Sequence, residues 1–272
     1  MKIFITGAGG FIGQATITEL VNHGHTVLGM ARSPSSQETV KSLGAEPFNA
    51  TLEDTEALKS AASQCDGVIH LAFVHDFEDF EKSTRIDQAA IGALAEGLAA
   101  GPGGAKGKPL VIASGTMMLP KGEPATEDAK AEEQLPWSLR AKSADLVYDL
   151  SRDTGIRGSV MRLPPTVHGA GDKGMIPMIV GALKEKAGYV AIIGDGSVRW
   201  PTVHRSDAAV LFRLAVEKGT GGATYHAVAE GAVPMKDIMA VAGKKTGVPV
   251  EKKTVEELMS AIGMLGGKSY RR

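Results

Sequence analysis

Residues 6–13 read TGAGGFIG and follow directly on a short apolar run at residues 2–6. Gly7, Gly10 and Gly13 are spaced Gly-x-x-Gly-x-x-Gly. Glycine at these positions permits a tight turn, a close approach of the backbone to a pyrophosphate, and close packing of a helix on a strand. A helix that begins here presents free N–H groups and the positive end of its dipole to phosphate groups. The stretch therefore predicts a strand, a turn and a helix that bind a dinucleotide.

The end of the second predicted strand indicates which dinucleotide is bound. In a NAD-binding unit this strand usually ends with Asp or Glu, roughly 20 residues after the glycines, which holds the ribose 2′-hydroxyl. Here residues 29–33 read GMARS and contain no acid. Arg32 can form a bidentate contact with a 2′-phosphate, and Ser33 can add a hydroxyl donor. We therefore predict NADP(H) as the cofactor, with a solvated surface arginine as the alternative interpretation of Arg32.

Short apolar runs alternate with longer helical patterns up to residue 163. The strand candidates are residues 2–6, 26–31, 67–71, 110–113 and 158–163, and the helical stretches lie near 11–23, 54–64, 78–100 and 136–153. Repeated strand–crossover–strand units with continuous apolar strands are typical of a parallel, doubly wound sheet. The predicted fold class is therefore α/β, with a Rossmann-type sheet.

The pattern changes after residue 163, where glycine and proline interrupt the stretch PPTVHGAGDKG. Further helices are predicted at 176–187, at 206–218 and from Pro234, together with a strand at 223–228. We therefore expect two domains. Residues 1–163 form the NADP(H)-binding Rossmann domain, and residues 164–272 form a smaller substrate-binding lobe that is partly interleaved with the sheet.

The composition excludes several classes of protein. Of the 272 residues, 43% are apolar and 22% are charged, an ordinary balance for a globular protein with an ample core. The net charge of −1 argues against nucleic acid or an anionic membrane as the main partner. The single cysteine, Cys65, cannot form an intrachain disulfide and suits a reducing compartment. Since glycines break the apolar start and no signal-peptide pattern is present, we expect a cytoplasmic protein.

Stretches along nearly the whole chain resemble, in order, the short-chain dehydrogenase/reductase superfamily, in its extended and atypical, NAD-dependent epimerase/dehydratase-like branch. They are TGAGGFIG (6–13), GVIHLA (67–72), VIASGT (111–116), RLPPTVHGAGD (162–172), GDGSVRWPTVHRSDAA (194–209) and HAVAEGAVPMKDI (226–238). The second resembles the strand end beside the cofactor ribose, and the third the strand that leads to the catalytic hydroxyl. The resemblance implies that the cofactor is bound by Gly7, Gly9, Gly10, Phe11, Ile12, Gly13, Arg32, Ser33, Leu71, Ala72, Phe73, Arg140 and Pro164.

In this superfamily a Tyr-x-x-x-Lys pair begins the long helix in the middle of the chain. The lysine binds the ribose and lowers the tyrosine pKa, and the tyrosine gives a proton to the substrate oxygen. A gapless match places Pro136 at the tyrosine position and Arg140 at the lysine position. Proline cannot donate a proton, and arginine keeps its charge without deprotonating at working pH. The usual acid is therefore missing from the predicted site.

Tyr148 and Arg152 also have one-turn spacing, but they lie far along the same helix. Tyr148 is eight residues from Arg140, which corresponds to ~12 Å along a helix axis. Ordinary contacts on the helix surface therefore explain this pair better than catalysis does.

Other side chains are candidates for the chemistry. Ser114 and Thr116 both lie beside the expected catalytic hydroxyl, and the sequence does not decide between them. Asp87 stands where the branch often has asparagine, either as part of an altered water relay or as a helix-surface charge. His168 and His204 fall in the motifs expected to line the substrate cleft, as acids or as structurally bonded histidines. No His, Cys or carboxylate cluster has the spacing of metal ligands.

These features predict an NADPH-dependent reductase of a carbonyl or an imine in a small, fairly apolar substrate. A redox-neutral epimerase, dehydratase or isomerase with bound NADP, and a non-catalytic NADP(H)-sensing protein, are the alternatives. Hydride transfer to an iminium neutralises a charge and needs no acid, and Asp87 could favour that cation if it faces the cleft. We expect a small molecule as substrate, neither nucleic acid nor membrane as partner, and a homodimer as the candidate assembly.

Overall fold

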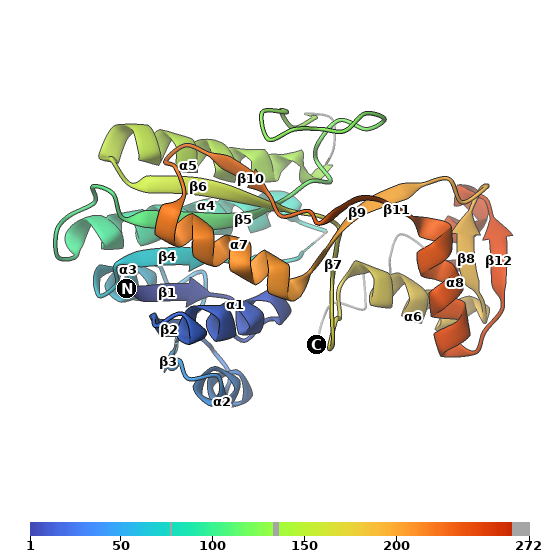
Figure 1. The fold of residues 1–272 in the computed structure, drawn as a ribbon, viewed down its shortest axis with the longest axis horizontal. Coiled ribbons are helices and arrows are strands. Elements are labelled where there is room, and N and C mark those ends of the chain that lie inside the picture. Colours follow the sequence, from blue (N-terminus) through green and yellow to red (C-terminus); the bar gives the residue numbers. More distant parts are fainter. Residues whose placement is uncertain (77, 133–135, 263–272) are drawn as a thin grey trace. The chain divides into compact units, whose positions relative to one another are not determined.

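The computed structural model describes residues 1–76, 78–132 and 136–262, which divide into two compact units. The first unit consists of Met1–Leu163 and Arg205–Ala227 (Figure 1). The second consists of Pro164–His204 and the described residues from Val228 onward. The segment that returns to the first unit contains the helix predicted at 206–218 and the strand predicted at 223–228. A substrate-binding role of the second unit stays a prediction.

A seven-stranded sheet forms the centre of the first unit. Its order is β10-β6-β5-β4-β1-β2-β3, and every pairing is parallel. The strands are β1 (Lys2–Thr6), β2 (Thr26–Met30), β3 (Glu46–Phe48), β4 (Gly67–His70), β5 (Pro109–Gly115), β6 (Arg157–Leu163) and β10 (Thr224–His226). The predicted Rossmann-type fold and its five N-terminal strands are confirmed. β3 was not predicted, because three residues that include a proline give no strand pattern.

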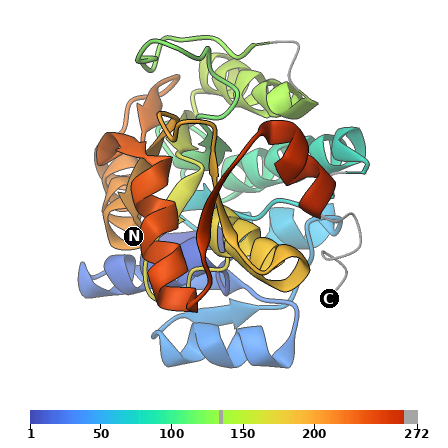
Figure 2. The same ribbon diagram turned by 90° about the vertical axis from the view of Figure 1, so that its right-hand side faces the viewer.

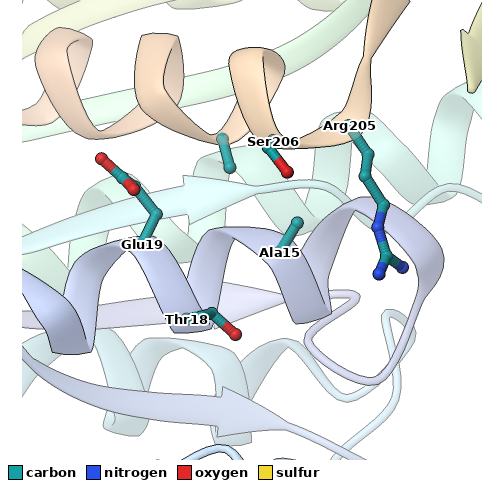
Figure 3. A pocket seen from close by; sticks show the side chains of 6 residues that line it. Ala15, Thr18, Glu19, Arg205 and Ser206 are labelled. Carbon is teal, nitrogen blue, oxygen red and sulfur yellow. The ribbon is translucent and has the colours of Figure 1, made fainter. Parts of the chain in front are cut away.

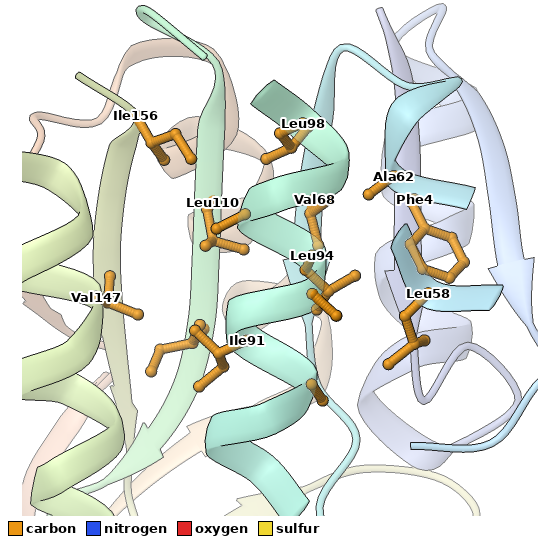
Figure 4. Close-up of a cluster of buried hydrophobic side chains, with 14 of the residues drawn as sticks. Phe4, Leu58, Ala62, Val68, Ile91, Leu94, Leu98, Leu110, Val147 and Ile156 are labelled. Carbon is orange, nitrogen blue, oxygen red and sulfur yellow. The ribbon is translucent and has the colours of Figure 1, made fainter. Parts of the chain in front are cut away.

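Helices cover both faces of this sheet. They are α1 (Phe11–Asn22), α2 (Pro34–Ser42), α3 (Thr55–Ser63), α4 (Phe80–Ala100), α5 (Ala141–Thr154) and α7 (Arg205–Lys218). Successive strand side chains point to opposite faces, so Ile3 and Ile5 pack with α1 and α7. Phe4 and Val68 pack with α3, α4 and α5 on the other face, where Figure 4 shows the larger core. Both faces are therefore buried, as a parallel sheet requires.

Side-chain caps fix where several of these helices begin. Asp54 accepts from the amide of Ala57 at the start of α3, and Asp79 accepts from Lys82 at the start of α4. α2 was missed in the sequence, although Ser33 caps it and Pro34 occupies its first position. A serine followed by proline is a known start signal for a helix, and it lay immediately after the second strand.

The long helix predicted at 136–153 is divided in two. A 3₁₀ segment spans Pro136–Arg140, and the α-helix α5 begins only at Ala141 and ends at Thr154, followed by Gly155, whose φ is 74°. Arg140 therefore lies at the junction of the two segments, as the last residue before the α-helix.

The second unit contains two small sheets and three helices. One sheet has the order β11-β9-β7, and the other pairs β12 with β8. Its elements are β7 (Thr166–His168), α6 (Met175–Ala187), β8 (Val190–Ile193), β9 (Arg199–His204), β11 (Glu230–Pro234), α8 (Met235–Thr246), β12 (Val250–Lys253) and α9 (Val255–Ile262). α6 and α8 pack against β8 (Figure 2). The buried residues of this core are Val180, Val190 and Met239. The helices at 176–187 and from Pro234 are confirmed, whereas these short strands were not predicted.

No helix among the described residues combines the length and the apolar character needed to cross a membrane. Cys65 is buried, and desolvation raises the pKa of its thiol to about 11. This cysteine is therefore a small core residue rather than a reactive thiol.

Gly97 and Gly92 of α4 provide a matched test of the packing between α3 and α4. A Cβ at Gly97 would collide with the carbonyl oxygen of Lys59, whereas a Cβ at Gly92 has no atom within 4 Å. Gly97→Ala should lower the free energy of unfolding by ~1–3 kcal/mol, because the backbone of α3 must move. Gly92→Ala should leave it unchanged or raise it by up to ~1 kcal/mol. Urea unfolding measures both changes, and equal effects would contradict this packing.

Candidate active site

The order of the strands identifies where a ligand binds. β1 and β4 are neighbours, but β1 leads to α1 on one face of the sheet and β4 leads to α4 on the other. Ligands of open α/β sheets bind at such a switch point, beyond the carboxyl ends of the strands. The loops that follow β1 and β4 therefore form the centre of the candidate site.

The glycine loop after β1 has the geometry that a pyrophosphate needs. Gly7 has a φ of 70°, and a Cβ there would lie 2.9 Å from the amide nitrogen of Ala72. A Cβ at Gly13 would collide with the carbonyl oxygen of Gly7, so this glycine lets α1 pack against the loop. The N-cap residue of α1 is Gly10, which has no side chain that could accept a hydrogen bond from the first amides of the helix. Within the described residues, the amides of Phe11 and Ile12 are paired with no acceptor. The loop therefore fits the diphosphate of a dinucleotide.

Arg32 and Ser33 connect β2 to α2 beside this loop. Arg32 is exposed and forms no ion pair with any described residue. The Ser33 hydroxyl accepts from the Ser36 amide at 3.2 Å, so it serves first as the cap of α2. A Cβ at Gly9 would lie 3.0 Å from the Cβ of Ser36, which places the glycine loop next to the start of α2. Among the described residues Arg32 is therefore a cation without an ion pair at this position, and Ser33 is mainly structural.

A chain of four buried side chains lies below the loops and was not found in the sequence. Thr6 Oγ1 and His70 Nδ1 are 2.8 Å apart, and His70 Nε2 is 3.1 Å from Asp87 Oδ1. The Ser143 hydroxyl donates to Asp87 Oδ2 at 2.6 Å. All four residues are at most 1% exposed. The chain joins the ends of β1 and β4 to α4 and α5.

The hydrogen bonds of Thr6 assign the proton on His70. Thr6 Oγ1 accepts from the amides of Leu71 at 3.1 Å and Ala72 at 3.2 Å, which uses both of its lone pairs. Its own hydrogen is therefore donated to His70 Nδ1. The imidazole is then neutral and carries its proton on Nε2, from which it donates to Asp87.

Asp87 does not face a cleft. Burial raises the pKa of its carboxyl, but the hydrogen bond from His70, the charge of Arg140 and the hydrogen bond from Ser143 outweigh this and hold the pKa below its ordinary value. Both oxygens are occupied, and the ionised group has no proton to give. Asp87 is therefore a buried anion that orders its neighbours, so its interpretation as a helix-surface charge is wrong. A part in an altered water relay stays a prediction.

Arg140 lies near this anion, at the start of α5. Its Nη2 donates to the carbonyl oxygen of Ala113 at 2.8 Å, and its guanidinium carbon lies 4.0 Å from the centre of the Phe73 ring. Burial lowers the pKa of Arg140, and Asp87 opposes that change, so the guanidinium stays charged. Arg140 Nε is buried without a hydrogen-bond partner in the described residues. The structure thus holds a desolvated cation between β5 and the start of α5. Its equivalence to the superfamily's lysine stays a prediction.

The remaining sequence candidates of the first unit lie at the end of β5, in the 3₁₀ segment and on α5. Ser114 is buried near the end of β5 and points to the same face as Ile112, which α4 and α5 cover. Thr116 is half-buried just beyond the strand, and its amide donates to the carbonyl oxygen of Leu163. Pro136 and Arg140 both belong to the 3₁₀ segment, as the gapless match places them, and Tyr148 does not replace the missing tyrosine. Its hydroxyl lies 2.5 Å from Thr224 Oγ1 of β10, at the edge of the sheet.

His168 and His204 lie in the second unit, where they are partners in register on β7 and β9. Their ring centres are 5.4 Å apart. Pro164 also belongs to the second unit. A role of the two histidines as acids stays a prediction. No group of three or more His, Cys, Asp or Glu residues in the described ranges is arranged to hold a metal ion.

Asp87→Asn tests the charge of the buried chain without removing its hydrogen bonds. The amide oxygen can accept from His70, and the amide nitrogen can donate to Ser143. Since the pKa of Asp87 lies below its ordinary value of 3.8, its charge contributes stability above that pH and loses it as the pH falls. The wild type should therefore exceed the variant in free energy of unfolding by a constant amount above about pH 5, and by less below about pH 4.

Urea unfolding of both proteins at a series of pH values measures this difference. A difference that stays constant into acid would show that Asp87 is not an ionised group in the folded protein. Glu96→Gln is the matched control, because Glu96 lies on the exposed side of the same helix.

Known proteins are similar to this chain over most of its length. The model of the NAD dependent epimerase/dehydratase family matches residues 3–229. The chain is 41% identical over 269 residues to uncharacterized protein YLL056C of Saccharomyces cerevisiae, which covers 97% of this chain and 87% of that protein. It is 27% identical over 281 residues to 2-alkyl-3-oxoalkanoate reductase of Stenotrophomonas maltophilia, with 97% and 76% covered.

The fold is similar to that of the dTDP-glucose 4,6-dehydratase DesIV of Streptomyces venezuelae, with a TM-score of 0.75 and 18% identity over 97% of this chain and 91% of that one. The motifs, the strand order and the family match agree. The chain belongs to the NAD dependent epimerase/dehydratase family and is an oxidoreductase of the short-chain dehydrogenase/reductase type.

Proposed function

We propose that this protein is an NADPH-dependent reductase of the carbonyl group of a small, fairly apolar substrate. The observation that carries the proposal is Arg140, a half-buried cation at the position that the gapless match gives to the lysine of the Tyr-x-x-x-Lys pair. The similarity to 2-alkyl-3-oxoalkanoate reductase supports reduction of a carbonyl. Phe73, whose ring centre is 5.6 Å from that of Phe80, supplies an apolar surface beside the cation.

NADPH, when bound, supplies a hydride to the carbonyl carbon and leaves negative charge on the carbonyl oxygen. A fixed positive charge at a site of low dielectric constant stabilises such an oxygen strongly. Arg140 is such a charge, and it needs no reorientation because Ala113 and Phe73 hold its guanidinium. It does not give up a proton at working pH, so the final proton comes from water or from a hydroxyl such as Ser114 or Thr116.

The charges of the site favour a carbonyl over an imine. The case for an iminium rested on Asp87 facing the substrate, but Asp87 is buried and bound by His70 and Ser143. Within the part of the chain that the structure describes, the charge without an ion pair is instead the guanidinium of Arg140. A cationic substrate next to a desolvated guanidinium is repelled, whereas an oxygen that becomes negative is attracted. The proposed site therefore compensates for the missing tyrosine with a fixed cation, and its substrate is a carbonyl compound rather than an imine.

The residues that would hold the cofactor lie along the carboxyl ends of the strands. The free amides of Phe11 and Ile12 would bind the diphosphate, and the segment Leu71–Phe73 would lie against a ribose. Arg32 would bind the 2′-phosphate, because it is exposed, without an ion pair, and next to the start of α2. The choice of NADPH over NADH rests on this one side chain.

Arg32→Ala tests the choice of cofactor. We expect the wild type to bind NADPH more tightly than NADH, and the variant to lose most of that difference. A charge-assisted contact with a phosphate contributes ~1.5–3 kcal/mol, which is about tenfold to a hundredfold in affinity. Titration of cofactor fluorescence measures both dissociation constants. Equal affinity of the wild type for the two cofactors would contradict the assignment.

Arg140→Met tests the proposed role of the cation. With a matched ketone and cyclic imine, the variant should lose about a hundredfold or more in kcat/KM for the ketone, the usual effect of removing one oxyanion-stabilising group. The loss for the imine should be much smaller, and Arg140→Lys should retain part of the ketone activity. Lys142→Met is the control, because Lys142 is an exposed cation two residues away. Equal losses for ketone and imine would contradict the role.

A further inference from the structure

Arg205 is a second cation next to the glycine loop. It is the first residue of α7, which packs beside α1 in the first unit. Its guanidinium carbon lies 5.1 Å from the centre of the Phe11 ring. Figure 3 shows the side chain extending from the start of α7 toward the start of α1. Between the two helices is a cavity of about 160 Å³, too small to hold a dinucleotide itself.

No carboxylate of the described residues pairs with Arg205. Glu19 lines the same cavity, but its carboxylate is bound by Arg213 at 2.7 Å. His23 lies 3.4 Å from the same Glu19 oxygen. Arg213 also pairs with Glu217 at 2.9 Å. Glu19 and Glu217 are therefore occupied by other cations. Asp207, in the first turn of α7, is exposed, and no carboxylate among the described residues forms an ion pair with Arg205.

The surroundings of Arg205 make an unbalanced positive charge unfavourable. It lies at the start of its own helix and beside the start of α1, and both ends carry the positive pole of a helix dipole. α1 has no acidic residue in its first turn, and the amides of Phe11 and Ile12 are unpaired in the described structure. The start of α7 has Asp207 in its first turn, whereas the start of α1 has no acid. The positive pole of α1 and the guanidinium of Arg205 thus repel one another, and an anion between them would relieve that repulsion.

We propose that Arg205 is a ligand of the diphosphate of the bound dinucleotide, completing with its charge the anion site that the free amides of α1 begin. The proposal rests on the dinucleotide binding described above. The Phe11 ring would hold the flat face of the guanidinium through a cation–π contact and leave its N–H edges free for phosphate oxygens. The same chemistry could come from a phosphate group on the substrate, so the ligands used in the test must separate the two sources.

The test compares Arg205→Met with Arg32→Ala by fluorescence titration of NADPH and NADH and by displacement with ADP-ribose and 2′-AMP. A diphosphate contact is shared by both cofactors and by ADP-ribose. Arg205→Met should therefore weaken all three by a similar factor of about tenfold to a hundredfold and leave 2′-AMP unchanged. Arg32→Ala should weaken only NADPH and 2′-AMP. Arg205→Lys should lie between the wild type and Arg205→Met.

Two controls separate binding from a general loss of charge or fold. Lys218→Met removes one exposed cation from the other end of α7 and should leave every affinity unchanged. The Tm of Arg205→Met without ligand should equal or exceed that of the wild type, because the variant removes a repulsive charge, while its rise with NADPH should be smaller.

Three results would overturn the proposal. Unchanged binding of NADPH and NADH by Arg205→Met would reject the contact and leave the proposed function intact. A loss confined to NADPH and 2′-AMP would assign Arg205 to the 2′-phosphate instead. A wild type that binds neither cofactor nor ADP-ribose would reject this proposal together with dinucleotide binding.

Discussion

Four buried side chains, Thr6, His70, Asp87 and Ser143, form one hydrogen-bonded chain beneath the candidate site, and the parts of the site are joined through it. Thr6 also binds the amides of Leu71 and Ala72 and so fixes the loop after β4. Each donor has an acceptor within the chain, which removes the cost of burying these polar groups. Because each of these side chains is a hydrogen-bond partner of the next, replacing one of them leaves a buried neighbour without its partner.

The same chain places a negative charge inside the protein, and this charge makes a second buried charge tolerable. Arg140 is desolvated by Phe73 and by the end of β5, and the field of Asp87 opposes the cost of that burial. The Asp87 carboxylate accepts hydrogen bonds from His70 and Ser143. Among the described residues it forms no direct ion pair with Arg140, so the N–H groups of Arg140 stay available. A cation that is held in place and still unpaired can act on a substrate oxygen. Under the proposed function, this cation compensates for a tyrosine acid that the gapless match does not place in the site.

The sequence predicted those parts of the structure that depend on short stretches of chain. The glycine loop, the five strands and the position of Arg140 all follow from local pattern and spacing. The buried chain does not, because its bonds join residues that are 64, 17 and 56 positions apart. A signal was present nonetheless: Thr6 and His70 end otherwise apolar strands, on the face of Phe4 and Val68. The short strands of the second unit, interrupted by glycine and proline, offered no comparable pattern.

The central claim is that the protein transfers hydride to a carbonyl group and releases an oxidised cofactor. NADPH with deuterium at the transferred position of its nicotinamide ring tests this most directly, with a 3-oxo ester as substrate and mass spectrometry of the product. The account predicts one deuterium on the carbinol carbon of the product alcohol and one NADP⁺ released for each alcohol formed. Deuterium that stays on the cofactor while the substrate is isomerised or dehydrated would contradict it, as would NADPH binding without any turnover.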